Sequence, residues 1–296
     1  MFFLSVAQDD IRLISRGSRI AGLPPSYNDC CFARLAIPRC EVEGGRLAGM
    51  KVDKFSPEFH SLPSFRLSGW SDVEELFEFR DAFLHDHPGQ QMLFVLDDSA
   101  QAGYQSGHAQ HKHGLAPHGD ALDLTTEQRA VWEEDQIAPA EIYSAFVVNA
   151  IRSKLDNEFK IEKRIHLELS DVEFFECLED ESRIFASPLR AATVFADETS
   201  MGIAAYPNGY FADDLSPMQN YLLAELLKAE FGIELFGLGS FLAGFVSADP
   251  FTKQEAQAIV SRVRGLLYEM SDEAADKWTE TTAGQRWFVL SYVGGS

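Results

Sequence analysis

The stretch Met92-Leu93-Phe94-Val95-Leu96-Asp97-Asp98 decides how this chain is organised. Its first five residues form a continuous apolar run of strand length, and such a run predicts a strand when turn-forming residues bound it. The run follows Pro88-Gly89 and ends at the two aspartates. We therefore expect a strand over residues 92–96 with polar groups at its carboxyl end.

A helix and a hairpin are predicted before this strand. Ser71 can cap a helix, because Glu74 stands three residues later as in a capping box and an apolar stripe follows. His87-Pro88-Gly89 ends that helix. Further back, Gly44-Gly45 separates the apolar segments 31–42 and 46–55, which predicts two strands joined by a tight turn.

The 26 residues after the strand, 99–124, show no hydrophobic periodicity. Loops of that length in compact domains are usually functional or disordered. The sequence therefore predicts an N-terminal α+β domain over residues 1–98, a His- and Gly-rich loop or linker over 99–124, and a C-terminal α+β domain over 125–296.

Strand and helix signals also alternate in the second half. Helices are expected from Thr125 or Thr126, after Pro139, over 171–181, after Ser216-Pro217 and over 252–270; strands are expected over 159–169, 192–196, 202–206, 233–238, 241–246 and 287–293. Strands that pair locally between helices predict an α+β fold with mixed or antiparallel sheets and helices on one face, in two halves of similar topology.

Charge excludes some classes of partner. The chain carries 46 acidic and 25 basic side chains, a net charge of −21 that repels the phosphate backbone, so nucleic acid is not the expected partner. A basic protein partner fits this charge. The N-terminus carries no signal-peptide pattern, and the longest apolar run, residues 236–246, is too short for a membrane helix. We expect a cytoplasmic protein with no membrane contact, whose four cysteines are reduced thiols.

A histidine-rich segment gives one functional hypothesis. Neutral imidazoles from His108, His111 and His113 suit Zn²⁺ or another divalent transition metal, and Asp97 and Asp98 add carboxylates. Such a set predicts a metal-dependent hydrolase. The competing interpretation is a solvated loop, in which case no cofactor is required, because the H-E-x-x-H pattern of zinc proteases is absent.

A second hypothesis places a binding surface near a predicted turn. It combines aromatic anchors with polar acceptors: Tyr206, Asn208, Tyr210, Phe211, Asp213 and Asp214. The competing interpretation is a hairpin whose aromatic residues pack on the following helix. Our leading expectation is a non-catalytic protein-binding or regulatory module with an acidic, aromatic surface; the metal-dependent hydrolase is the alternative, and mimicry of nucleic acid by the acidic C-terminal half is a third.

No complete catalytic motif is present in the sequence. Ser240 does not lie in a G-x-S-x-G elbow, and the last histidine, His166, precedes it, which excludes a serine triad in the usual hydrolase order. The glycines around residues 44–51 and 237–244 match neither a Walker loop nor a dinucleotide-binding fingerprint. The sequence therefore leaves open whether the protein is an enzyme.

Overall fold

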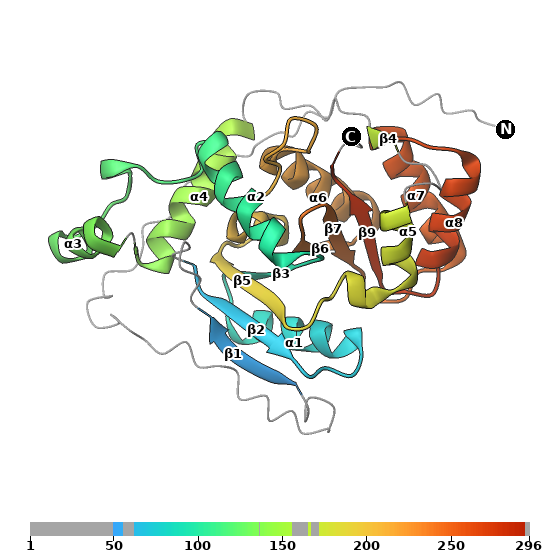
Figure 1. Cartoon of the computed structure of the whole chain (residues 1–296), viewed down its shortest axis with the longest axis horizontal. Coiled ribbons are helices and arrows are strands. Elements are labelled where there is room, and N and C mark those ends of the chain that lie inside the picture. The colour runs from blue at the N-terminus through green and yellow to red at the C-terminus, as the bar shows by residue number, and fades with distance from the viewer. Residues whose placement is uncertain (1–49, 56–61, 136, 156–164, 167–171, 294–296) are drawn as a thin grey trace. The chain divides into compact units, whose positions relative to one another are not determined.

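A seven-stranded mixed sheet organises the part of the chain that the computed structural model describes, which is residues 50–55, 62–135, 137–155, 165–166 and 172–293 (Figure 1). In sheet order the strands are β1 (Lys51–Phe55), β2 (Ser64–Ser68), β5 (Leu189–Phe195), β3 (Gln90–Val95), β6 (Glu234–Leu238), β7 (Leu242–Val246) and β9 (Trp287–Ser291). β3 and β6 pair in parallel, and the other neighbours pair antiparallel.

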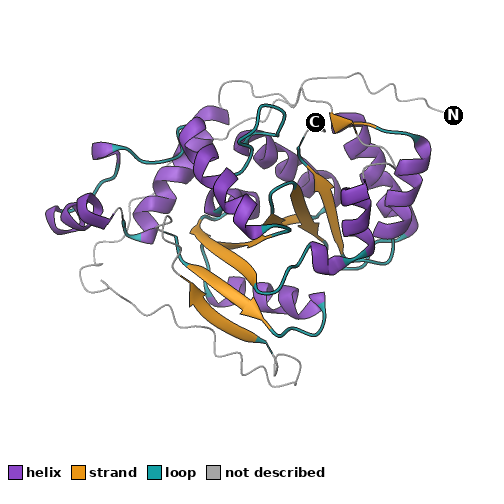
Figure 2. Ribbon diagram, viewed as in Figure 1, coloured by secondary structure: helices purple, strands orange, loops and turns teal. Residues whose placement is uncertain are grey.

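Helices surround this sheet (Figure 2). They are α1 (Val73–Asp86), α2 (Ser99–Lys112), α3 (Thr126–Asp135), α4 (Ala140–Leu155), α5 (Val172–Glu179), α6 (Pro217–Phe231), α7 (Lys253–Leu267) and α8 (Asp272–Thr282), with short 3-10 turns η1 (Gly119–Ala121), η2 (Glu181–Arg183) and η3 (Thr199–Ala205). A small parallel pair joins β4 (Ile165–His166) to β8 (Tyr268–Glu269). The predicted α+β class with a mixed sheet is confirmed.

The helices cover both faces of the sheet, so the expectation of helices on one face is wrong. Side chains of consecutive strand residues point to opposite faces. On β3, Phe94 packs edge-on to Phe236, which also contacts Phe77 of α1. The preceding Leu93 instead lies next to Gly202 of η3 on the other face. A sheet that is covered on both faces explains why residues 92–96 are uniformly apolar and buried.

Strands that precede and strands that follow residues 99–124, the predicted linker between two domains, belong to one sheet. β5 lies between β2 and β3 in the sheet, so strands from both sides of that segment interleave. The described residues between Met50 and Val293 group as one compact unit. Most of the predicted linker is helix α2, which begins directly after β3 and lies on the same side of the sheet as α4 (Figure 1).

Local capping signals set several helix boundaries. Ser216 and Gln219 form a complete capping box at the start of α6, where Pro217 occupies the first turn. α6 ends at Gly232, whose left-handed φ of +70° suits glycine. At α1 the cap is Asp72 rather than Ser71, because the Asp72 side chain accepts from the backbone N–H of Glu75.

Other predicted strands differ from the structure or lie outside it. Residues 202–206 belong largely to η3 instead of a strand. Of the predicted first hairpin, residues 31–42 and Gly44-Gly45 lie outside the described residues, and β1 pairs with β2. Of the predicted strand over 159–169, only β4 is described.

Candidate functional site

The five predicted metal ligands do not meet, because Asp97 follows β3 and the other four are distributed along α2 and its two caps. Asp98 is the N-cap of this 14-residue helix and His113 is its C-cap, so these two residues are separated by about 22 Å at roughly 1.5 Å per residue. No group of three or more His, Cys, Asp or Glu side chains within the described residues could hold a metal ion. The predicted metal set is therefore not assembled.

Each histidine of that set has another contact. His108 packs between Tyr104 and Tyr210, with ring centroids 4.3 Å and 4.8 Å away. His111 lies beside His118, at a centroid separation of 5.8 Å. A ring nitrogen of His113, Nε2, lies 3.0 Å from the carbonyl oxygen of Gly209.

Asp97 occupies a strained and buried position at the carboxyl end of β3. Its φ of +47° makes it the one non-glycine residue with positive φ in the described part of the chain. Its carboxylate accepts hydrogen bonds from three consecutive backbone amides, those of Ser240 at 2.6 Å, Phe241 at 3.3 Å and Leu242 at 3.2 Å. Asp97 therefore fixes the turn between β6 and β7.

Gly239 permits this close approach. A Cβ at position 239 would meet the Asp97 carboxylate and the Leu96 carbonyl oxygen at distances that no real Cβ shows. The same turn is held from its other side, where the Asn208 side-chain amide and the Tyr292 hydroxyl both donate to the Gly239 carbonyl oxygen. Asp97, a predicted metal ligand, and Asn208, a residue of the predicted binding surface, thus both bind the turn between β6 and β7.

A cavity of about 370 Å³ lies beside Asp97, lined by Asp97, Asp98, Gln101, Glu173, Cys177, Arg183, Ser240 and Phe241. Burial raises the pKa of Asp97 from 3.8 to about 6, although its hydrogen bonds with residues 240–242 act in the opposite direction. Burial also raises the pKa of the Cys177 thiol to about 12, which keeps the thiol protonated and poorly nucleophilic. Arg183, the basic residue of the lining, forms an ion pair with Glu176 at 2.7 Å. Among the described residues that line this cavity, none is an activated nucleophile with a neighbouring base.

The six residues of the predicted surface separate into a buried and an accessible group. Tyr206, Asn208 and Asp214 are buried; the Tyr206 hydroxyl accepts from Arg190 at 3.3 Å, and Asp214 accepts from the backbone N–H of Phe211 at 2.9 Å. Tyr210 is half-buried, whereas Phe211 and Asp213 are exposed. The predicted hairpin is a loop in which Gly209, with a φ of +94°, lies against Leu215.

Helix α2 completes an exposed aromatic patch with this loop. Tyr104 and Phe211 each lie beside Tyr210, with ring centroids 6.1 Å and 5.1 Å from the Tyr210 ring. We call Tyr104, His108, Tyr210 and Phe211 the aromatic surface. Tyr104 is not among the predicted surface residues, because residues 99–124 have the sequence pattern of a loop. Its i, i+4 spacing from His108 is the one feature of the sequence that could place both residues on the same helix face.

Comparison with protein-family models, with curated proteins and with solved structures found no match for the chain. None of the helices in the described ranges is both long and apolar enough to cross a membrane.

Proposed function

We propose that this chain is a cytoplasmic, non-catalytic protein-binding module that engages a basic partner through the aromatic surface. The observation that carries the proposal is the exposure of two large apolar side chains that both contact Tyr210, Tyr104 at 52 % and Phe211 at 46 %. Among the described residues, the other exposed large hydrophobic side chains are Val131 and Ile137, outside this patch. Contiguous exposed aromatic groups commonly mark protein-binding sites.

The aromatic surface is held in place before any partner arrives. The Lys112 ammonium donates to the backbone carbonyl oxygens of Tyr210 and Phe211, at 2.6 Å and 3.3 Å. Asp214 accepts from the backbone of Phe211, and His113 contacts the carbonyl of Gly209. A preorganised loop loses less conformational entropy on binding, so more of the contact energy contributes to affinity.

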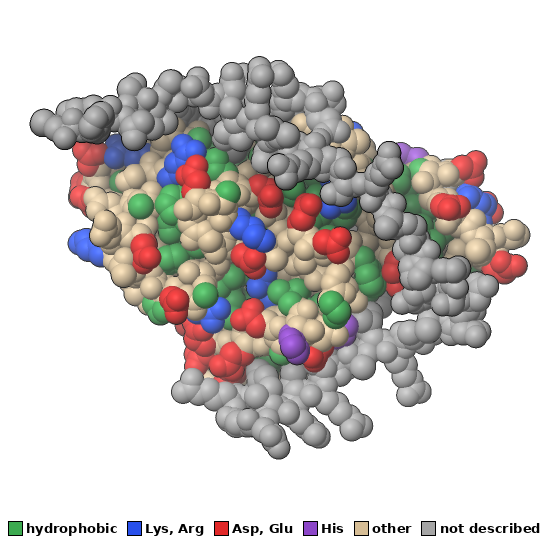
Figure 3. Space-filling model, turned by 180° about the vertical axis from the view of Figure 1, so that it is seen from behind, with side chains coloured by type: hydrophobic (Ala, Val, Ile, Leu, Met, Phe, Trp, Pro, Cys, Tyr) green, Lys and Arg blue, Asp and Glu red, His purple; other side chains and the backbone are tan. Residues whose placement is uncertain are grey.

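Charge supports a basic partner. The net charge of −21 favours association with a positively charged protein, and Asp213 is exposed next to the aromatic surface. Arg and Lys side chains can also pack on aromatic rings by cation–π contact. On the face shown in Figure 3, acidic side chains are interspersed with Lys and Arg. That mixture gives no support to mimicry of nucleic acid on this face.

The test uses a phage library of random 12-residue peptides, selected against the full chain. We expect enriched peptides that combine Arg or Lys with aromatic or large aliphatic residues. Their affinity should fall by on the order of 10-fold or more in the Tyr104→Ala/Phe211→Ala variant, because aromatic anchors dominate binding energy.

Val131→Ala/Ile137→Ala is the matched control, since it removes equally exposed apolar side chains elsewhere. It should retain the wild-type affinity. Enrichment of acidic or uncharged peptides, or an equal affinity for the Tyr104→Ala/Phe211→Ala variant, would overturn the proposal, as would a selection that enriches nothing.

A further inference from the structure

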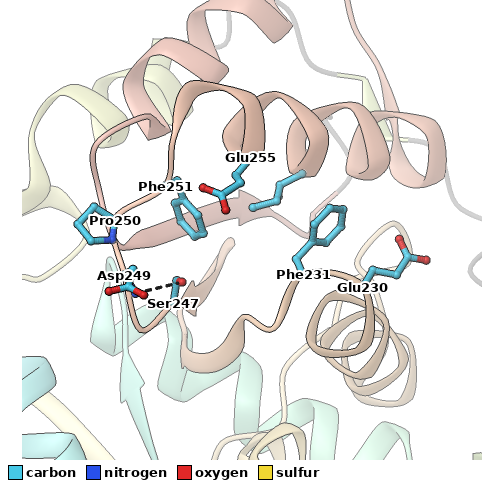
Figure 4. A pocket seen from close by; sticks show the side chains of 8 residues that line it. Glu230, Phe231, Ser247, Asp249, Pro250, Phe251 and Glu255 are labelled. Atoms are coloured by element: carbon cyan, nitrogen blue, oxygen red, sulfur yellow. Dashed lines mark hydrogen bonds between the residues drawn. The ribbon is translucent and has the colours of Figure 1, made fainter.

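A second cavity, of about 330 Å³, lies between the end of α6, the loop after β7 and the beginning of α7 (Figure 4). Its apolar lining comes from Phe231, Phe251, Ile259 and Pro250, and its acidic lining from Glu230, Asp249 and Glu255. Among the described residues, neither Lys nor Arg lines it. These residues are separate from those of the aromatic surface, so a ligand in this cavity is independent of the proposed function.

The apolar part of the cavity is well anchored. Phe251 and Ile259 are buried in the core, and Phe231 is half-buried at the end of α6. Figure 4 shows the Phe231 ring on the α6 side and the Phe251 ring on the side of the loop before α7, with Glu255 close to Phe251. Phe231 is the more accessible of these two rings, and both border a hollow that is large enough for one long side chain.

The three carboxylates of the lining differ in their hydrogen-bond partners within the protein. The Glu230 carboxylate accepts two hydrogen bonds from the Arg262 guanidinium, from Nε at 2.7 Å and from Nη2 at 2.6 Å. Glu255 accepts from the backbone N–H and hydroxyl of Thr252 in the capping box of α7, at 2.8 Å and 2.7 Å. The Asp249 carboxylate has no hydrogen bond or ion pair with any described residue, although its backbone N–H lies 3.4 Å from the Ser247 hydroxyl.

We propose that this cavity binds a guanidinium-bearing side chain, that of arginine, whose charged end lies against Asp249 while its apolar stem and planar face pack on Phe231 and Phe251. Charge complementarity selects a cation, since Asp249 and Glu255 leave the lining negative after Arg262 has neutralised Glu230. The aromatic walls select a flat, weakly hydrated cation over a compact ammonium, because guanidinium groups stack on aromatic faces.

The experiment is a calorimetric titration of the full chain with N-acetyl-arginine amide. N-acetyl-citrulline amide, which is nearly the same shape but neutral, serves as the ligand control. We expect saturable millimolar binding of the arginine derivative and binding of the citrulline derivative that is weaker by on the order of 10-fold. N-acetyl-lysine amide should bind less tightly than the arginine derivative.

Two variants locate the contact. Asp249→Asn should weaken arginine binding by about 5- to 10-fold, and Phe231→Leu, which retains apolar bulk, by about threefold. Glu273→Gln is the charge-matched control, because Glu273 is exposed on α8 outside the cavity, and it should leave the affinity unchanged. Circular dichroism checks that each variant is folded.

Absence of saturable binding, equal affinity for the citrulline derivative, or undiminished binding by Asp249→Asn would each overturn this inference. The Tyr104→Ala/Phe211→Ala variant must still bind the arginine derivative. A loss of binding in that variant would place the site on the aromatic surface and refute the cavity assignment.

Discussion

Asp97 gives the stability of the protein a pH dependence with a defined sign. Burial raises the pKa of this carboxyl from 3.8 to about 6 in the folded state, so the folded protein binds the proton more tightly than the unfolded chain does. The resulting contribution to stability is fully present below the unfolded pKa and is lost as the pH rises through about 6. A shift of roughly 2 pKa units corresponds to about 3 kcal/mol.

The perturbation that isolates this contribution is Asp97→Asn, because an amide does not titrate. Urea unfolding is followed by fluorescence at about pH 7.5 and about pH 4.5, a window that captures about 2 kcal/mol of the change. As the pH falls from about 7.5 to about 4.5, the free energy of unfolding of the wild type should rise by about 2 kcal/mol more than that of Asp97→Asn. With a denaturant slope of about 1–3 kcal/mol/M, the extra displacement of the urea midpoint is on the order of 1 M.

Asp213→Asn is the control, since Asp213 is exposed, and its pH dependence should follow that of the wild type. The comparison uses the change with pH within each protein, so any constant destabilisation caused by the new side chain cancels. If Asp97→Asn and wild type gain equal stability between the two pH values, burial does not raise the pKa of Asp97 and the reasoning is refuted.

Three substitutions test the fold around the site. Gly239→Ala should destabilise the protein by more than about 2 kcal/mol in urea unfolding, because its Cβ would meet the Asp97 carboxylate; full stability would contradict the close approach of this turn. Phe236→Ala should cost about 3–5 kcal/mol, since this fully buried ring contacts Phe77 and Phe94, and a loss below about 1 kcal/mol would show that the aromatic core is misplaced. Ser216→Ala should lower the thermal midpoint through a loss of about 1 kcal/mol from the capping box of α6, whereas Ser153→Ala, on the exposed side of α4, should leave it nearly unchanged.

Elements with strong local signals could be predicted from the sequence. α6 and α7 carry a cap residue, a partner three residues later and an apolar stripe, all within one stretch of chain. The apolar run over residues 92–96 likewise contains most of β3, because burial on both faces requires continuous apolar residues. In these elements the chemistry that sets the structure lies within a few residues.

Helix α2 could not be predicted from periodicity, because the side it buries is small or polar. Its buried residues are Ala102, Gln105, Ser106, Ala109 and Gln110, which form no apolar stripe. Hydrogen bonds to distant groups satisfy some of them; the Tyr143 hydroxyl of α4, for example, donates to Gln110. Because α2 lacks the apolar periodicity of an amphipathic helix, its sequence has the pattern of a loop.

The candidate sites also depend on contacts between distant parts of the chain. Tyr104 and Tyr210 lie side by side although about a hundred residues separate them, and Asp97 binds amides beyond residue 239. From the sequence alone, Tyr210 and Phe211 could be predicted as candidate residues of a binding surface. It could not show that Tyr206 and Asp214 are buried, or that α2 brings Tyr104 to the same surface.

The most direct test of the aromatic surface as a binding site is amide chemical-shift mapping of the full chain with the strongest selected basic peptide. We predict that the largest perturbations fall on Tyr104, His108, Tyr210 and Phe211, and that at the same peptide concentration they are much smaller in Tyr104→Ala/Phe211→Ala. Perturbations centred elsewhere, for example around Val131 on α3, would contradict the account even if the peptide bound tightly.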